Sequence, residues 1–380
     1  MYFFAADSIA NAQAALEAGR LAEARVLLES QVNDGRAQAL LARVYLGLKM
    51  PQKAALAARA AQRLGSGVPA AQHALALYFA QSGQRKLAAL WEGRFAETGE
   101  ADAGAGLRAA LLFAEVGVWP EAIRFGVAAL ERGDRADLRM TLARGYEATG
   151  KPDLAVAQYR ALLNLSPYDE AAHATYGQAL LRMGRFNEAS LFLAEAREKF
   201  DKSPQMELAY GVALYAQRRF ALAGERFLRV IELGPEVPQP YIFLARMIDQ
   251  LPEKAAEIRD RAEAWLRIEP KNGFAPYVVA RAMAACGVAD SEVRPVLLEA
   301  LRRDGTVWEF PFELGQLLER GRDYAGAAAA FEKAVALNAR AAEPHYRLAR
   351  VYDRLGLTAK AERERALHQK LLAQPKVGME

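Results

Sequence analysis

Residues 136–167 read ADLRMTLARGYEATGKPDLAVAQYRALLNLSP. In this stretch the small residue Ala143 is followed by Tyr146 after three positions and by Gly150 after seven, and a second small residue, Ala155, comes after twelve. Glycine adopts the left-handed backbone that ends a helix, and the proline that closes the stretch disfavours helix in the residue before it. The stretch therefore predicts a helix, a tight turn at Gly150 and a second helix.

The two small residues recur along the chain at a nearly constant period. Counterparts of Ala155 lie mostly 33 or 34 residues apart, at Ala24, Ala54, Ala88, Ala122, Ala189, Ala223, Ala327 and Ala361. Counterparts of Ala143 lie twelve positions upstream of them, at Ala12, Ala42, Ala76, Ala110, Gly177, Gly211, Gly315 and Ala349. Two series locked together in this way predict tandem helix pairs whose small residues face each other where the helices come closest.

The repeat resembles the tetratricopeptide repeat. The residues that carry the resemblance in the quoted stretch are Leu142, Ala143, Tyr146, Gly150, Ala155, Tyr159 and Pro167, and residues 308–338 and 342–373 show the same pattern. The resemblance implies an all-α fold, a right-handed α-solenoid superhelix of about eleven antiparallel helix pairs. Abundant Ala and Leu with Arg, Glu and Gln favour helix independently of it.

We expect one solenoid domain over residues 1–373, with a flexible tail at 374–380. The repeats are regular over 35–237 and 305–373, but the alanine series lapses over 238–304. Two helix pairs still fit there, 239–250 with 253–268 and 274–286 with 290–303, so a repacked stretch of the same solenoid is expected. The aromatic Tyr2-Phe3-Phe4 start is expected either to pack over the first pair or to be the remnant of a longer segment.

Composition argues against several other classes of function. The formal net charge is only +4, with basic and acidic residues interspersed, which does not favour nucleic-acid binding. The single cysteine, Cys286, allows no disulfide or thiol cluster and is expected to fill a small buried space. The four histidines form no paired metal-ligand spacing, so neither metal nor cofactor is expected. Nucleophile-elbow, Walker and dinucleotide-binding motifs are absent from the sequence, so we expect no enzyme.

The start of the chain does not fit a secretory signal, because its apolar run is short and no basic residues precede it. No uncharged apolar stretch reaches the length that crosses a bilayer. The expected location is the cytoplasm, or the periplasm if an export signal has been removed.

The resemblance implies that the first helix of each pair lines the concave surface. The position just after the first small residue holds Arg43, Arg144, Arg246 and Arg350, with Arg281 aligned to them, and aromatic residues lie nearby. The predicted partner-binding residues are Arg144, Arg246, Phe274, Tyr277, Arg281, Phe312, Tyr346 and Arg350. Guanidinium groups and aromatic rings dominate interface hot spots, so this groove would suit an extended or helical segment carrying carboxylates.

The function predicted from these features is a non-catalytic scaffold that binds a peptide or protein segment in its concave groove. The Asn and Lys pattern of the chaperone-binding carboxylate clamp is absent. One alternative interpretation is an envelope-associated module of a larger assembly or secretion system. At the level of residues, the alternative is that the aromatics are ordinary core and the arginines pair with neighbours such as Asp249 or Asp353.

Overall fold

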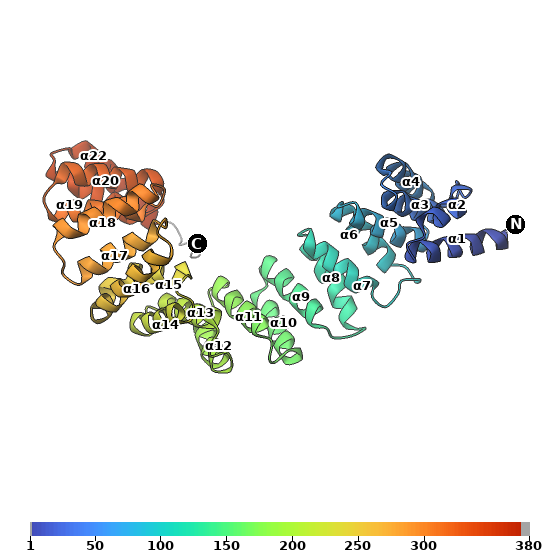
Figure 1. Ribbon diagram of the computed structural model, residues 1–380, viewed down its shortest axis with the longest axis horizontal. Helices are drawn as coiled ribbons and strands as arrows, with labels where there is room; N and C mark the ends of the chain where they lie inside the picture. The colour runs from blue at the N-terminus through green and yellow to red at the C-terminus, as the bar shows by residue number, and fades with distance from the viewer. Residues whose placement is uncertain (1, 374–380) are drawn as a thin grey trace. The chain divides into compact units, whose positions relative to one another are not determined.

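The computed structural model describes residues 2–373, with side chains from Ser8 onward, so the packing of Tyr2-Phe3-Phe4 and the tail at 374–380 lie outside the described part. Every regular element in that part is helical, and the 22 α-helices follow one another in pairs (Figure 1). The predicted all-α array of about eleven helix pairs is therefore confirmed.

The chain divides into two compact units, Met1–Ala172 and His173–Glu380, and the boundary falls inside α11 (Glu170–Arg182). A single domain over 1–373 stays a prediction. The N-terminal unit contains α1 (Tyr2–Glu17), α2 (Leu21–Glu29), α3 (Gly35–Gly47), α4 (Pro51–Leu64), α5 (Pro69–Gln81), α6 (Arg85–Ala96), α7 (Ala105–Glu115), α8 (Trp119–Leu130), α9 (Ala136–Ala148) and α10 (Pro152–Leu165).

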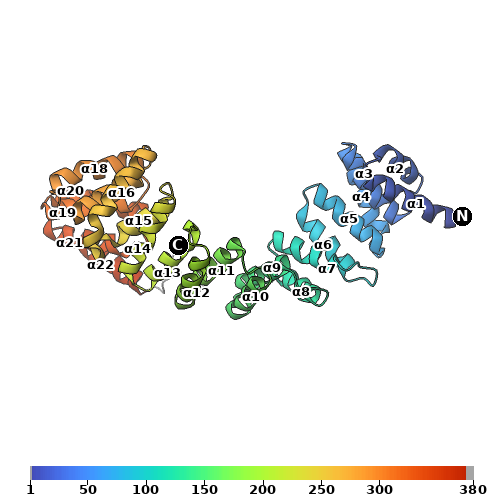
Figure 2. The same ribbon diagram turned by 60° about the horizontal axis from the view of Figure 1, so that its bottom comes forward.

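The C-terminal unit continues the same order of pairs, which Figure 2 shows from a second direction. It contains α12 (Phe186–Lys199), α13 (Pro204–Ala216), α14 (Phe220–Leu233), α15 (Pro238–Met247), α16 (Ala255–Ile268), α17 (Phe274–Ala285), α18 (Asp290–Arg303), α19 (Glu309–Arg320), α20 (Tyr324–Leu337), α21 (Ala342–Arg354) and α22 (Thr358–Leu372).

The small residues lie where the helices of a pair touch. Ala54, Ala88 and Ala155 are fully buried, as are their counterparts along the chain. Where glycine takes the first position, an added methyl group would collide with the partner helix: a Cβ on Gly315 would lie 2.6 Å from the ring of Phe331. Close approach of the two backbones is therefore the reason for the small-residue series.

The stretch 238–304 keeps its helix pairs but packs them differently. Helix α15 continues into two short 3-10 turns, η1 (Ile248–Gln250) and η2 (Pro252–Lys254), and α16 packs mainly against α17 rather than against α15. The large Ile258 replaces the usual alanine and is fully buried, and Trp265 stacks on Tyr241 with ring centroids 4.4 Å apart. Bulky core residues thus substitute for close backbone contact in a locally repacked solenoid.

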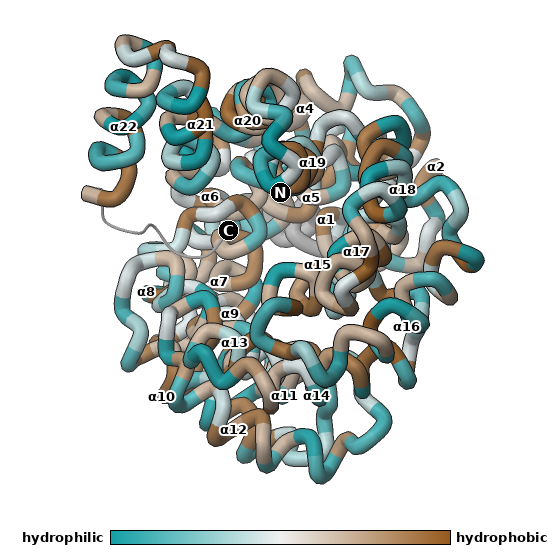
Figure 3. The backbone as a smooth tube through the Cα atoms, turned by 90° about the vertical axis from the view of Figure 1, so that its left-hand side faces the viewer, coloured by the Kyte–Doolittle hydropathy of each residue, from teal (hydrophilic) through white to brown (hydrophobic). Residues whose placement is uncertain are grey.

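Helix α22 closes the array at its C-terminal end. It packs against α21, and Ala361 is its only fully buried residue. Figure 3 shows its backbone as mostly hydrophilic in residue type. A terminal helix of a solenoid must present one face to water, and this composition lets α22 do so.

Candidate functional site

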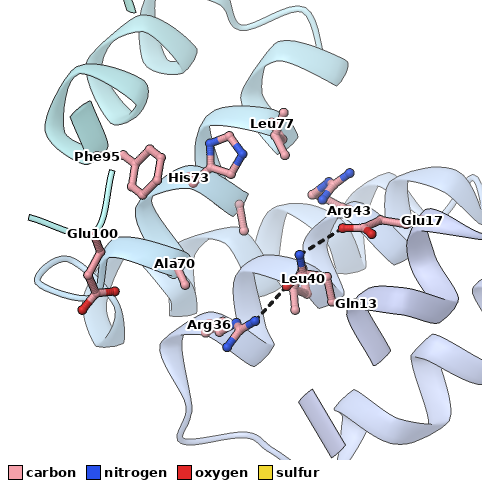
Figure 4. Close-up of a pocket in the computed structure, with 11 residues that line it drawn as sticks. Gln13, Glu17, Arg36, Leu40, Arg43, Ala70, His73, Leu77, Phe95 and Glu100 are labelled. Atoms are coloured by element: carbon pink, nitrogen blue, oxygen red, sulfur yellow. Dashed lines mark hydrogen bonds between the residues drawn. The ribbon is translucent and has the colours of Figure 1, made fainter. Parts of the chain in front are cut away.

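First helices of successive pairs pack side by side, α3 against α5 and α7 against α9 in the N-terminal unit and α15 against α17 in the C-terminal unit, and the side that they share is here called the first-helix face. In the N-terminal unit this face carries a pocket of about 290 Å³ lined mainly by α1, α3 and α5 (Figure 4). Apolar groups on its wall include Leu40, Ala74, Leu77 and Phe95. Its size and mixed lining suit a side chain of a bound segment rather than a whole small-molecule cofactor.

Arg43 is the cation of this pocket that has no side-chain partner among the described residues, and the exposed carboxylate of Glu100 also lines the pocket. Among the described side chains no carboxylate lies within ion-pairing distance of it, and its Nε is buried without a hydrogen-bond partner. Burial lowers the pKa of the Arg43 guanidinium, and the charge of nearby Glu17 partly opposes that effect. A guanidinium that is partly desolvated and unpaired gains free energy when a carboxylate reaches it.

Other polar groups of the pocket are already engaged with one another. Gln13 donates to Glu17 at 3.0 Å and accepts from Arg36 at 2.8 Å, both drawn as dashed lines in Figure 4. His73 lies 2.9 Å from Glu92 through Nδ1, and its ring sits against that of Phe95. Among the described lining residues, these contacts leave Arg43 and the exposed Glu100 as the charged groups without a side-chain partner.

Glu92 is a buried residue that holds the wall of the pocket in place through its contacts with neighbouring helices. Its carboxylate is almost completely buried, and Arg108 donates to it from Nε at 2.7 Å. Arg108 also holds Asp102 on the connection between α6 and α7. Hydrogen bonding from Arg108, partly opposed by burial, lowers the pKa of Asp102 to about 2. The network ties α5, α6 and α7 together around the pocket.

In the C-terminal unit, the arginines that the sequence predicts as partner-binding residues are already paired with carboxylates of the chain. Arg281 donates to Glu313 at 2.9 Å and to Asp249 at 2.9 Å, and its side chain is only 13% exposed. Burial lowers the pKa of Arg281, but the charges of Glu313 and Asp249 outweigh this and raise it overall. Arg246 pairs with Glu309 at 2.9 Å, and Arg350 lies 3.5 Å from Glu319.

The predicted aromatics divide between core and surface. Tyr277 and Phe312 are buried, with Tyr277 stacked on Phe310 and Phe312 against Phe331, and burial raises the pKa of Tyr277. Phe274 is half-buried, edge-on to the same Phe310. For these three residues, the structure agrees with the alternative interpretation that the aromatics belong to the core.

Four of the predicted residues do offer surface, among them Arg246, whose side chain is 45% exposed. Tyr346 is 43% exposed, its ring lies beside His368, and Arg350 lies over that ring at 5.8 Å. Arg144 is exposed on α9 in the N-terminal unit, whereas the other seven predicted site residues belong to the C-terminal unit. The eight residues therefore do not form one surface within either unit, and partner binding by them stays a prediction.

Cys286 is exposed, so the expectation that it fills a buried space was wrong, because it caps the end of α17.

Metal-ligand clusters of three or more groups do not occur among the described residues. No helix in the described part of the chain is long and apolar enough to cross a membrane.

The family described as tetratricopeptide repeat matches residues 146–211. No curated protein matches the chain in sequence. Among solved structures, the chain is similar to one titled as Naa15/Naa10 bound to HypK-THB, with 12% identity, a TM-score of 0.53, and coverage of 96% of this chain and 68% of that one. At that identity the likeness concerns the fold alone. The family match shows tetratricopeptide repeats over residues 146–211, and the solved structure shows that nearly the whole chain shares the same fold of stacked helix pairs.

Two further solved structures show lower similarity. The Cut9-Hcn1 hetero-tetramer of the APC/C gives 13% identity and a TM-score of 0.47, covering 98% of this chain and 82% of that one. Yeast Tom70 gives 14% identity and a TM-score of 0.47, covering 98% and 92%.

Proposed function

We propose that the protein is a non-catalytic interaction scaffold, and that the first-helix face of its N-terminal unit binds a segment of a partner protein. The observation that carries the proposal is the contrast between Arg43 and the C-terminal arginines. Arg43 faces an open pocket without an ion-pair partner, whereas Arg246, Arg281 and Arg350 all have carboxylates of the chain within 4 Å.

The chemistry of the pocket defines the segment that would bind there. The guanidinium of Arg43 would pair with a carboxylate of the segment. The neighbouring Leu40, Leu77 and Phe95 would pack against an apolar side chain next to that carboxylate. Further along the same face, the positions equivalent to Arg43 are Leu77 on α5, the partly exposed Leu111 on α7 and Arg144 on α9. An arginine, two leucines and a second arginine would favour a segment with acidic residues on both sides of an apolar centre.

The scale of such binding follows from ordinary interfaces. A standard interface buries about 800 Å² on each partner, and affinities of about 1 μM correspond to about −8 kcal/mol. Paired arginines in the C-terminal unit would have to give up a buried partner to bind a ligand, which costs part of the gain. The unpaired Arg43 carries no such cost.

Selection from a displayed random-peptide library tests the proposal. Peptides enriched on the wild-type chain are measured by fluorescence anisotropy against Arg43→Glu and Leu77→Glu, with the exposed Lys151→Glu of the same unit as a charge-change control. We expect each pocket variant to weaken binding by about tenfold or more and the control to change it little. Equal binding to wild type and both pocket variants, with helicity intact, would show that the pocket is not the site.

A further inference from the structure

A second surface in the N-terminal unit is set apart by its charge. Residues 51–96 contain six Lys or Arg and a single acidic residue, Glu92. Their formal charge of +5 exceeds the +4 of the whole chain, so the remaining residues together are slightly acidic. The single carboxylate is buried and bonded to His73 and Arg108, so it does not neutralise the surface.

Helix α4 places three of these cations around one exposed leucine. Lys53, Leu56, Arg59 and Arg63 follow helical spacing along one side, while the alanines Ala54, Ala57, Ala58 and Ala61 of the opposite side are buried. Leu56 is 65% exposed. Lys53, Arg59 and Arg63 are exposed, and none has a carboxylate within 4 Å among the described side chains.

Helix α6 repeats this arrangement one repeat later. Lys86, Leu90 and Arg94 are exposed and spaced four residues apart, which puts them on one side of the helix. Leu90 lies 34 residues after Leu56, so the two leucines occupy equivalent positions of successive repeats. Arg94 lies over the ring of Trp91, 4.6 Å from its centroid, and pairs with no carboxylate among the described side chains. Equivalent positions of neighbouring repeats share one face of a solenoid.

A cavity of about 290 Å³ opens beside Leu56. Val32, Leu41 and Tyr45 line it together with Leu56 and Lys53. The one carboxylate at its edge, Glu29, accepts a hydrogen bond from Tyr45 at 2.9 Å and lies 3.6 Å from Arg25. The cavity can therefore receive an apolar side chain, with cations rather than free acids around it.

We propose that this outer face of α4 and α6 binds an acidic amphipathic helix of a partner protein. An apolar side chain of that helix would fill the cavity beside Leu56, and its carboxylates would pair with Lys53, Arg59 and Arg63. A phosphate backbone would satisfy the cations but would leave the leucines and the cavity in water. A fluid lipid surface would cover the leucines but does not need a cavity of fixed shape.

The experiment uses the full chain and a displayed library of amphipathic helical peptides with varied charge. Enriched peptides are synthesised, and their affinity is measured against Leu56→Ser/Leu90→Ser and against Lys53→Glu/Arg59→Glu/Arg63→Glu. The controls are Leu154→Ser, another exposed leucine on α10, and Arg363→Glu/Lys370→Glu on α22. Circular dichroism verifies that each variant keeps its helices.

We expect enriched peptides to carry Asp or Glu beside leucine at helical spacing. Each outer-face variant should weaken their binding by about tenfold or more, and charge reversal should also remove its salt dependence. A peptide that binds both outer-face variants as tightly as it binds wild type does not use this face. The proposal is wrong if every enriched peptide binds the variants in this way. It is also wrong if no peptide binds and phosphatidylserine vesicles bind in a manner that Leu56→Ser/Leu90→Ser abolishes, or if no peptide binds and duplex DNA binds in a manner that Lys53→Glu/Arg59→Glu/Arg63→Glu abolishes.

Discussion

Nη1 of Arg281 lies 2.9 Å from both carboxylate oxygens of Glu313, a contact that joins α17 to α19 across two successive repeats. Both side chains are nearly buried, at 13% and 10% exposure. The pair converts what would be a free cation on the first-helix face into a link between repeats. The C-terminal unit thus uses arginine for cohesion where the N-terminal unit leaves Arg43 open.

Replacing Glu313 with Gln should destabilise the C-terminal unit. The change leaves the Arg281 guanidinium nearly buried with only Asp249 as a charged partner, and breaking a buried pair in this way costs about 3 kcal/mol. Urea denaturation followed by circular dichroism measures the loss. Glu309→Gln is the matched control, because its partner Arg246 is 45% exposed and such pairs contribute about 1 kcal/mol or less. Equal losses in the two variants would contradict a structural role for the Arg281–Glu313 pair.

Alanine at Gly315 should destabilise the same unit by about 2 kcal/mol, because overpacking a tight core typically costs 1–3 kcal/mol. The new Cβ would lie 2.6 Å from the ring of Phe331. Gly321→Ala provides the control, since its Cβ would meet no atom closer than 3.6 Å and its φ of −73° suits any residue. That variant should be neutral or slightly stabilising. A stable Gly315→Ala protein would show that the helices of this pair can move apart freely.

The sequence predicted most of the fold because the features that determine it are local and periodic. Small residues twelve positions apart specify a close helix crossing, and a glycine at a fixed offset specifies the turn. Even the helix pairs of 239–250 with 253–268 and 274–286 with 290–303 lie close to α15–α18, since prolines and apolar spacing mark their ends. The division after Ala172 has no comparable mark in the sequence.

The site was harder to predict because its character depends on partners far along the chain. Glu313 and Glu309 lie 32 and 63 residues from the arginines they neutralise, so counting positions within a repeat could not show which arginines are free. Periodicity likewise could not show that Tyr277 and Phe312 turn into the core. The basic surface of α4 and α6 did leave a signal, the charge of residues 51–96, which is hidden when charge is counted over the whole chain.

Asp102 should make a contribution to stability that depends on pH. Because its pKa in the folded protein is lowered to about 2, its contribution is present above the pKa of an unfolded aspartate, about 4, and is lost as the pH falls toward 2. The difference in unfolding free energy between wild type and Asp102→Asn should therefore shrink between about pH 4 and pH 2. Urea titrations at several pH values measure it. A difference that stays constant across this range would show that the Arg108 contact does not hold the carboxylate ionised.

Glycine at position 218 should stabilise the protein. The left-handed residue that ends the first helix of a pair is usually glycine, as at Gly150 and Gly184, but Arg218 takes that place after α13 with φ of 59°. A left-handed backbone costs a residue with a Cβ about 1–2 kcal/mol, and the greater chain entropy of glycine offsets part of this. Arg218→Gly should therefore gain about 0.5–1 kcal/mol in thermal or urea unfolding.

The reciprocal change tests the same cause at a native glycine. Gly184→Lys places a side chain on a backbone with φ of 71°, where an added Cβ would meet no atom, so backbone conformation alone should decide the result. It should lose about 1 kcal/mol. If Arg218→Gly proved destabilising while Gly184→Lys did not, the side chain of Arg218 would have to make a contribution greater than the cost of its backbone.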